Sequence, residues 1–587
     1  MIRLLSKLTK IDYLLIFSVI IFTCFQAYLD LTLPDYMSEI TTLVQTENSK
    51  INDIYIAGGK MILCAFGSLS LAVIVAIIAS KVASNFSFEI RSKIFKKVMK
   101  FGTKEVNSFS TSSLITRTTN DITQVQLLIV MGMQMLIKAP ITAIWAIIKI
   151  YNKNLSWTIA TSVALGILFT IVTICLSLAI PRFKKLQTLT DNINKVSKES
   201  LDGINVVRAY NAETYQEEKF EKANNEITKT HIFTSKTMSF LMPSIQMINS
   251  GLVLAVYLIG AVLIDEAIGP DKMTLFSDMV VFSSYAIQVI MSFIMLVMVF
   301  MLLPRSSVAA NRINEVLNTK NSIVEGNKTA GKKGLKGQIE FKNVSFKYPD
   351  AEDYILKDIN FEAKEGEMIA FIGSTGCGKS TVINLVPRFY DATEGEVIIN
   401  GINVKEYTKD TLNSLIGYVS QKSTLFTGTI ESNIAFGDNK EVNKDQSNLQ
   451  TSIDIAQASE FISNLDKKYD SHVAQGGNNF SGGQKQRISI ARAIYREPEI
   501  FIFDDSFSAL DYKTDKKLRN SLKKECKNKT MLVVGQRIGT IKDADKIVVL
   551  EDGEIVGIGK HKQLLKNCDV YKQIALSQLS EEELENA

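Results

Sequence analysis

Histidine and closely paired cysteine are scarce in this 587-residue chain, which argues against two kinds of site. The three histidines, His231, His472 and His561, lie far apart and have no metal-ligand spacing. The six cysteines are scattered without a CxxC pair, and we interpret them as free thiols, as in a reducing cytosol. The sequence therefore favours neither a zinc site nor a disulfide framework.

The chain also has little excess charge, and its first apolar run is not expected to be a removable leader. Its formal net charge of +5 is small for this length and does not predict a nucleic-acid partner. The first apolar run is too long for a signal-peptide core and lacks a small-residue cleavage pattern, so we expect a retained span. The length is too great for one hydrophobic core, and two or more domains are expected.

Long apolar runs fill the first half of the chain. A helix needs about 20 mostly apolar residues to cross a bilayer. Lysine and arginine gather in residues 81–126 and 181–239, so these loops and both termini are expected in the cytoplasm, and 34–56 outside. The sequence predicts a multi-pass protein, expected in a bacterial plasma membrane, whose helices continue into the cytoplasm. The expected spans are 12–33, 57–82, 127–150, 156–180, 240–264 and 275–303.

Two of these spans contain a lysine. Lys60 lies near a span end and could extend its ammonium group to the interface. Lys138 lies deeper, next to Ala139 and Pro140, and either faces a substrate path or has a structural role.

The second half has the composition of a soluble α/β domain. The predicted fold class is a membrane domain of six transmembrane helices followed by an α/β phosphate-loop domain. The expected domains are 1–318 for the membrane domain, 319–337 for a polar, glycine-containing linker, 338–577 for the α/β domain and 578–587 for an acidic tail.

A phosphate-binding loop follows the apolar stretch EMIAFIG. The segment GSTGCGKST fits the pattern GxxxxGK[ST], between a predicted strand and a predicted helix. Backbone N–H groups of such a loop wrap the phosphates of a nucleotide, and its lysine and serine reach the β/γ-phosphates and Mg²⁺. The residues expected to bind ATP are Gly373, Ser374, Thr375, Gly376, Cys377, Gly378, Lys379, Ser380 and Thr381.

A second apolar strand, EIFIFDD, ends in Asp504 and Asp505. An aspartate at a strand end beside a phosphate loop can orient the hydration shell of Mg²⁺. We expect this role for Asp504, acting through water.

Between these motifs, FSGGQ at 480–484 resembles the LSGGQ signature of ATP-binding cassette (ABC) proteins. Six spans ahead of one cassette resemble a half-transporter of the type IV exporter fold. The resemblance implies that Tyr348 stacks on adenine, that Gln421 contacts Mg²⁺ and couples to the membrane domain, and that 508–511 is the D-loop. It also implies that VAQGG, before the signature, touches the cytoplasmic loops of the membrane domain, and that 107–117 and 206–215 contain coupling helices.

In the family that this chain resembles, two cassettes pair head to tail around ATP. The resemblance therefore implies that the signature contacts the ATP held by a partner chain. It adds Gln421 to Ser380 and, through water, Asp504 as the residues expected to hold Mg²⁺. The signature residues concerned are Ser481, Gly482, Gly483 and Gln484.

Two positions depart from the family pattern. Asp505 stands where fully active members have the glutamate that polarises the attacking water, and Gln536 stands in place of the switch histidine. Glutamine can donate a hydrogen bond but cannot become a cation. We therefore predict a degenerate site that binds ATP and turns it over slowly or not at all.

The intact signature would be useful if a different half-transporter supplied a complete site, which predicts a heterodimeric exporter. A homodimeric lipid or drug exporter, and an ATP-gated channel or regulatory ABC protein, are alternatives. Importers usually keep spans and cassette on separate chains. The methionines of the fifth and sixth spans suit apolar or amphipathic substrates, or else serve ordinary packing and lipid contact. Drugs, lipids and peptides all remain open as cargo.

Overall fold

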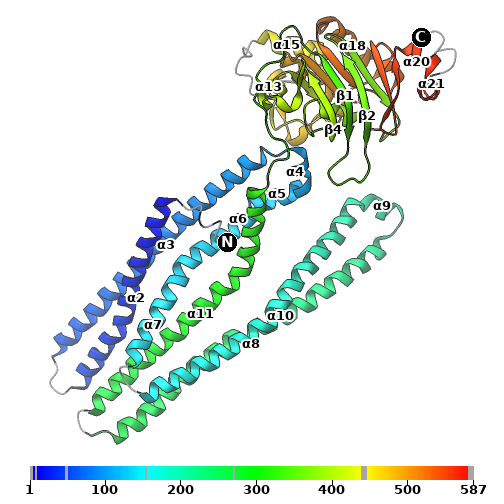
Figure 1. Ribbon diagram of the computed structural model, residues 1–587. Helices are drawn as coiled ribbons and strands as arrows, with labels where there is room; N and C mark the ends of the chain where they lie inside the picture. Colours follow the sequence, from blue (N-terminus) through cyan, green and yellow to red (C-terminus); the bar gives the residue numbers. More distant parts are fainter. Residues whose placement is uncertain are drawn as a thin grey trace. The chain divides into compact units, whose positions relative to one another are not determined.

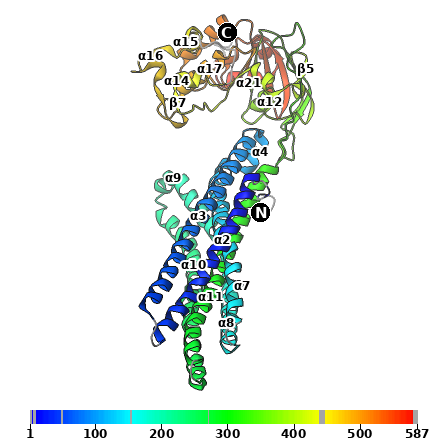
Figure 2. The ribbon, with the colours of Figure 1, turned by 90° about the vertical axis from the view of Figure 1, so that its left-hand side faces the viewer.

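The computed structural model describes residues 4, 6, 9–46, 50–151, 155–268, 271–437 and 446–579. The chain forms two compact units, shown as ribbons in Figures 1 and 2. The helical unit consists of Met1–Met99 and Thr111–Thr319, and the α/β unit of Lys100–Ser110 and Lys320–Ala587.

Six long helical segments of the helical unit are apolar enough to span a membrane, which confirms the predicted fold class. The helices run far past the apolar windows, as the long basic loops predicted. The third span contains one turn of π-helix between two α-helices (η1). The helices are α2 (Lys10–Gln45), α3 (Ile51–Val98), α5 (Thr111–Thr118), α6 (Asn120–Met131), η1 (Gly132–Leu136), α7 (Ile137–Tyr151), α8 (Leu155–Asp202), α9 (Ile204–Ala209), α10 (Glu213–Glu266) and α11 (Asp271–Asn318).

Helix α2 is longer than the first span that the sequence predicted. We expected an outward loop from residue 34, but α2 continues through Pro34 to Gln45. Asp35 therefore lies within the helix, where Lys149 of α7 pairs with it at 2.7 Å and the Tyr285 hydroxyl of α11 donates to it at 2.6 Å. Lys149 and Tyr285 thus stabilise the charge of the Asp35 carboxylate, which the hydropathy pattern placed outside the span.

Lys138 also has a partner inside the helical unit. Its ammonium group pairs with Asp30 of α2 at 2.9 Å, and Ser68 of α3 donates a hydrogen bond to the same carboxylate. The pair is only about one quarter exposed. Lys138 thus joins the first and third spans, while Lys60 lies 6.0 Å from the ring centroid of Tyr36.

We expect Lys138→Met to destabilise the helical unit, because it leaves the Asp30 carboxylate uncompensated among apolar helices, at a cost of up to about 3 kcal/mol. Thermal unfolding in detergent measures the effect. Lys60→Met is the matched control, and Asp30→Asn combined with Lys138→Met should recover most of the loss. Equal melting of the Lys138 and Lys60 variants would show that the ion pair contributes nothing.

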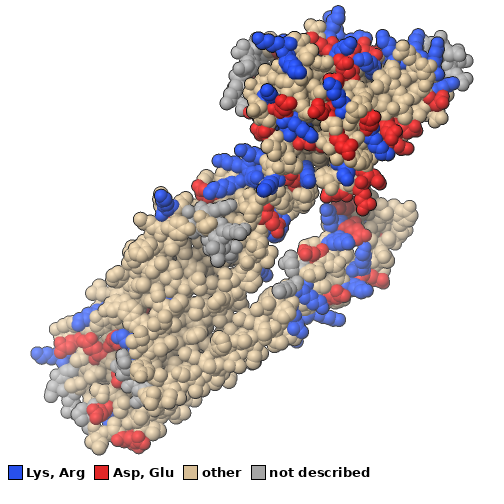
Figure 3. Space-filling model, in the orientation of Figure 1, with Lys and Arg blue, Asp and Glu red and all other residues tan. Residues whose placement is uncertain are grey.

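Two helix pairs of this unit pack along their lengths, α2 with α3 and α8 with α10 (Figures 1 and 2). The fully buried Trp157 of α8 donates its indole N–H to the Val256 carbonyl of α10 at 3.1 Å. Figure 3 shows that Lys, Arg, Asp and Glu gather toward the ends of these helices and leave an uncharged surface between. This distribution is expected of helices whose middle faces lipid.

The α/β unit contains two main sheets. One is antiparallel, in the order β2-β1-β4-β5, and the other has the order β12-β11-β3-β10-β9-β6, parallel except for β12. The strands are β1 (Ile339–Phe346), β2 (Leu356–Ala363), β3 (Met368–Gly373), β4 (Glu394–Ile399), β5 (Ile402–Asn403), β6 (Ile416–Val419), β7 (Gly428–Thr429), β8 (His472–Val473), β9 (Ile500–Asp504), β10 (Thr530–Val534), β11 (Lys546–Glu551) and β12 (Glu554–Gly559).

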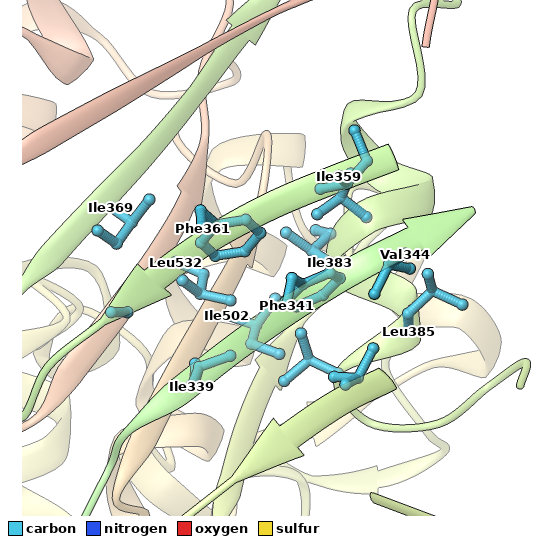
Figure 4. Close-up of a cluster of buried hydrophobic side chains, with 14 of the residues drawn as sticks. Ile339, Phe341, Val344, Ile359, Phe361, Ile369, Ile383, Leu385, Ile502 and Leu532 are labelled. Atoms are coloured by element: carbon cyan, nitrogen blue, oxygen red, sulfur yellow. The ribbon is translucent and has the colours of Figure 1, made fainter. Parts of the chain in front are cut away.

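A continuous apolar core joins the two sheets (Figure 4). Phe341 of β1 stacks on Phe361 of β2 with ring centroids 4.5 Å apart, and Phe361 meets Phe371 of β3 edge-on. Ile502 and Leu532 of the parallel sheet belong to the same buried cluster. The core fixes the positions of the strands whose ends carry the polar motifs.

Helices cover the parallel sheet, and several of them enclose a second apolar core together with buried residues of β6, β9 and β10. These helices are α12 (Lys379–Leu385), α13 (Lys409–Ser414), α14 (Ile430–Ile434), α15 (Gln446–Ile455), α16 (Ser459–Ser463), α17 (Gly482–Tyr495), α18 (Tyr512–Glu525), α19 (Ile538–Ile541), α20 (His561–Asn567) and α21 (Asp569–Leu576).

The α/β unit also includes α4 (Thr103–Phe109), whose C-terminal end overlaps the start of the first expected coupling region, 107–117. The buried Glu105 carboxylate accepts from the Gly102 N–H at 2.9 Å and from the Ser322 N–H of the linker at 3.0 Å. The Asn107 amide lies 3.5 Å from the Tyr390 hydroxyl. Thus α4 is held to both the linker and the sheet domain.

The C-terminal helices contain a buried histidine. His561 of α20 is 5% exposed, and its Nδ1 lies 2.6 Å from the Tyr571 hydroxyl of α21. Its Nε2 has no hydrogen-bond partner among the described residues. Burial, aided by the nearby Lys542, lowers the pKa of His561 below its usual 6.5.

We therefore expect the C-terminal helices to be more stable above pH 6.5 and to lose stability as the pH falls below that value, because the buried imidazole must become charged. Hydrogen exchange of residues 561–576, corrected for its intrinsic pH dependence, measures this. The exposed His472 provides the control variant His472→Gln, which should keep the pH effect, whereas His561→Gln should remove it. An effect that persists in His561→Gln would exclude this histidine as its origin.

Candidate nucleotide-binding site

Three polar segments meet at one edge of the parallel sheet. Strand β3 lies beside β10, and β10 lies beside β9, all parallel. In this register Val534 is opposite both Phe371 and Asp504. The phosphate loop, the two aspartates and the segment of Gln536 therefore leave the sheet side by side. Ligands of α/β sheets bind at this carboxyl edge.

Glycines give the phosphate loop its backbone path. A Cβ at Gly373 would lie 2.1 Å from the Leu550 carbonyl oxygen, so no side chain fits there. Gly378 has φ 100° and is the N-cap of α12, a left-handed conformation that favours glycine. Ser374, Thr375 and Gly376 are exposed at the rim of the loop. The loop thus opens onto a helix N-terminus, an arrangement suited to phosphate.

Lys379 holds the loop closed from within. Its ammonium group donates to the Gly373 carbonyl at 2.9 Å and to the Ser374 carbonyl at 2.6 Å. The buried Cys377 places its sulfur 3.7 Å from the same nitrogen. The side chain expected to reach the phosphates is therefore directed into the loop.

Ser380 and Asp504 meet, as a shared metal site requires. The Ser380 hydroxyl donates to the Asp504 carboxylate at 2.7 Å. Burial raises the pKa of Asp504, and the Ser380 hydrogen bond opposes that shift. A hydroxyl and a carboxylate oxygen suit Mg²⁺, which takes its other ligands from phosphate and water. These two residues fit the ion; when bound, it would neutralise phosphate charge.

Tyr348 lies against the phosphate-loop helix. Its hydroxyl is 3.1 Å from the Thr381 hydroxyl, and its ring packs edge-on against Phe346 and Tyr390 at 5.0 and 5.3 Å. The ring is thus held beside the loop, where the expected adenine contact would require it.

The two altered positions are in direct contact. The Gln536 side-chain amide donates to the Asp505 carboxylate at 2.9 Å. Asp505 is 8% exposed and has φ 47°, a left-handed conformation that aspartate tolerates. Burial raises the pKa of Asp505, whereas a hydrogen bond from Gln421 lowers it. Gln421 therefore lies near this carboxylate, and among the described residues no hydrogen bond joins its side chain to Asp504 or Ser380.

The signature begins helix α17, away from the phosphate loop of its own chain. Ser481 is the N-cap: its hydroxyl accepts from the Gln484 N–H at 3.3 Å, and the Gln484 side chain accepts from the Ser481 N–H at 2.9 Å. If Gly483 carried a side chain, its Cβ would lie 3.1 Å from the Ala509 carbonyl oxygen, which is a tight contact. A Cβ at Gly482 would lie 3.9 Å from the Ala509 side chain. The D-loop thus packs against the signature glycines.

No hydrogen bond recorded for the described residues joins 481–484 to the loop 373–381. Figure 2 shows α12 and α17 as separate helices of the α/β unit. Within one chain, the structure gathers the phosphate loop, Asp504, Asp505 and Gln536, and leaves the signature apart.

Sequence reasoning missed Ser506. This fully buried residue follows the two aspartates, and its hydroxyl donates to the Val419 carbonyl at 3.0 Å. The bond ties the end of β9 to the end of β6, from which Gln421 follows. A serine after two aspartates gives no signal of this contact in the sequence.

A phosphate-loop domain attached to six spanning helices defines a membrane transporter driven by nucleotide. The chain matches the ABC transporter family over residues 356–508 and the ABC transporter transmembrane region over 15–303. This chain belongs to the ABC transporter family. It is a multi-pass integral membrane protein with a cytoplasmic nucleotide-binding domain and an ATPase activity coupled to transport.

Similar proteins span nearly the whole chain. An uncharacterized ABC transporter ATP-binding protein of Mycobacterium tuberculosis is 36% identical over 89% of this chain and 87% of its own. An ATP-dependent lipid A-core flippase of Pseudomonas aeruginosa is 29% identical over 86% of this chain and 82% of its own. A bacterial Atm1-family ABC exporter with ATP bound shares the fold, with a TM-score of 0.82 and 22% identity over 97% of this chain and 99% of its own.

We expect Lys379→Ala to raise the Kd for ATP at this loop by about tenfold or more, because hydrogen bonds to charged groups contribute about 1.5–3 kcal/mol. Equilibrium binding of a fluorescent ATP analogue to the purified chain measures the change. Lys364→Ala, on the exposed turn after β2, is the matched control and should bind as wild type does. Unchanged affinity in Lys379→Ala would refute the assignment of this loop.

Proposed function

We propose that this chain is one half of a heterodimeric ABC exporter and that its own phosphate loop forms the slow, degenerate ATP site. The observation that carries the proposal is the 2.9 Å hydrogen bond from Gln536 to Asp505. Both positions that serve hydrolysis in the family are altered, and their side chains engage each other. The groups expected to bind ATP and Mg²⁺ are present alongside them.

The chemistry of the two side chains supports slow turnover. An aspartate carboxylate ends about 1.5 Å short of a glutamate carboxylate, and a misplacement near 1 Å can cost about 10²-fold in rate. The carboxylate of Asp505 already accepts a hydrogen bond from Gln536, which competes with an attacking water for its oxygens. The glutamine amide is neutral, so it cannot supply the positive charge of a protonated histidine to the γ-phosphate.

The signature supports the heterodimer. Its helix begins with a capping box of Ser481 and Gln484, which fixes the helix N-terminus, and the positive end of the helix dipole at this N-terminus suits a phosphate. We propose that it completes a second ATP site whose phosphate loop, glutamate and histidine come from a different half-transporter. A chain that took no part in ATP hydrolysis would not need an intact signature.

We propose that the cargo is an apolar or amphipathic molecule, moved out of the cytoplasm or the inner leaflet. Helices α8, α10 and α11 line a small cavity of about 40 Å³ whose lining is entirely apolar and includes Phe169, Phe293, Met242, Met298 and Met301. Methionine and phenylalanine adapt to varied apolar surfaces. The relative in Pseudomonas aeruginosa is a lipid A-core flippase, which supports a lipid-like cargo as one choice.

The test is to tag this chain, extract it gently from its native membrane and identify the co-purifying subunit by mass spectrometry. We expect a second half-transporter in equimolar amount in the purified complex, with glutamate after its strand-end aspartate and with a switch histidine. Only copies of this chain, hydrolysing ATP rapidly, would favour the homodimeric exporter. An assembly that passes ion current without substrate-stimulated turnover would favour the channel.

A further inference from the structure

Helix α19, which follows the segment of Gln536, begins without a cap of its own. Its N-cap residue, Arg537, makes no side-chain capping hydrogen bond. The first N–H groups of a helix need acceptors from outside the helix. The Ile538 N–H instead donates to the side-chain oxygen of Gln578, at 2.9 Å. A residue 40 positions further along the chain therefore caps this helix.

The same glutamine holds the other side of the turn. The Gln578 side-chain nitrogen donates to the backbone carbonyl of Gln536 at 2.8 Å. One amide group thus binds the backbone on both sides of Arg537. Among the described residues, Gln578 is the side chain that bonds to both the Ile538 N–H and the Gln536 carbonyl.

The Gln578 side chain is exposed, but the helix that precedes it is held in place by packing. Gln578 follows helix α21, and its own N–H bonds to the Ala575 carbonyl at 3.1 Å. The fully buried Tyr571 and Ala575 of α21 share an apolar cluster with the fully buried Ile538 and Ile541 of α19. The packing of α21 against α19 therefore presents the Gln578 side chain to the turn.

From these contacts we infer that Gln578 is a positioning residue for the ATP site. It fixes the backbone at Gln536, and that backbone sets where the Gln536 amide projects toward Asp505, 2.9 Å away. The C-terminal end of the chain thereby controls how long this site retains ATP. The inference rests on the proposed function, in which this loop binds ATP and hydrolyses it slowly.

The test uses the full transporter in lipid nanodiscs and the release rate of ATP from this chain. Photolabelling with 8-azido-ATP after a chase reports the occupancy of each chain separately. Gln578→Ala removes both hydrogen bonds. Gln578→Glu keeps an acceptor for the Ile538 N–H and loses the donor to the Gln536 carbonyl. Gln573→Ala, an exposed glutamine on α21, is the matched control.

We expect Gln578→Ala and Gln578→Glu to speed release from this chain by about three- to tenfold, the range of a lost hydrogen bond. Gln573→Ala should match wild type. A role that acts through the Gln536 side chain also requires the effect of Gln578→Ala to vanish in a Gln536→Ala background. Unchanged release, or the same acceleration in both backgrounds, would overturn the inference.

Failure of the proposed function gives a different result. In that case wild-type transporter would release label from this chain as ADP at the rate of turnover, before any substitution at Gln578 is made. Slow release of intact ATP from wild type, with no response to Gln578→Ala, would overturn only the role of Gln578.

Discussion

We expect Ser481→Ala to lower ATP turnover of the assembled transporter by about 10²-fold, whereas Asp505→Asn changes it by less than about twofold. In the proposed heterodimer the two residues serve different ATP sites. Ser481 caps the signature helix that faces the partner's ATP, and loss of a donor aimed at developing charge costs about 10²–10³-fold in rate. Asp505 belongs to the slow site, which contributes little to turnover.

Steady-state phosphate release from the purified complex measures both variants. Ser463→Ala is the control for Ser481, because Ser463 is an exposed serine at the end of α16 whose hydroxyl bonds only within its own turn, to the Glu460 carbonyl at 2.9 Å. It should leave turnover unchanged. The opposite ranking, with Asp505→Asn as the severe variant, would place the active site on this chain.

The second large effect is a gain of activity. We expect Asp505→Glu combined with Gln536→His to raise ATP hydrolysis by this chain, purified without a partner, by about 10²-fold over its weak basal rate. The longer glutamate side chain restores the reach of the carboxylate. A misplacement near 1 Å can cost about 10²-fold in rate, and this sets the size of the expected gain. Histidine restores a group that can carry a proton.

The two substitutions must act together because their side chains are in contact. Each single variant should recover much less than the pair. Adding Lys379→Ala to the pair should abolish the gain, which shows that the new activity arises at this phosphate loop. A double variant no faster than wild type would mean that these positions do not limit hydrolysis.

Much of the site could be predicted because its motifs are local. The phosphate loop lies between a strand and a helix, and the two aspartates end an apolar strand, so short segments indicate both. The contact between Gln536 and Asp505 depends instead on the pairing of β10 with β9. Each strand has its own buried, apolar sequence, and nothing in either specifies its neighbour.

The polar contacts inside the helical unit could not be predicted for a related reason. Hydropathy averages over a window, so it reports that Lys138 is in a span and not that Asp30 lies 2.9 Å away. The prediction of a loop from residue 34 was wrong because Pro34 and Asp35 are poor residues for a span when considered alone. Lys149 and Tyr285 supply the compensation from distant helices.

The role of Gln578 could not be predicted from the sequence for the same reason. This glutamine lies in a polar C-terminal segment that the sequence indicated only as a tail. Its role depends on the packing of α21 against α19, which brings its amide to the turn after Gln536. Local motifs thus indicated the groups that bind nucleotide, and tertiary packing revealed those that position them.

The most direct test of a slow site on this chain is the identity of the nucleotide that it retains during turnover. The native complex would be incubated with Mg²⁺ and radiolabelled ATP, separated from free nucleotide, quenched in acid and analysed by chromatography. If this chain holds the slow site, about half of the retained nucleotide is intact ATP, and Lys379→Ala on this chain removes that half. Retention of ADP alone, with or without Lys379, would contradict the account.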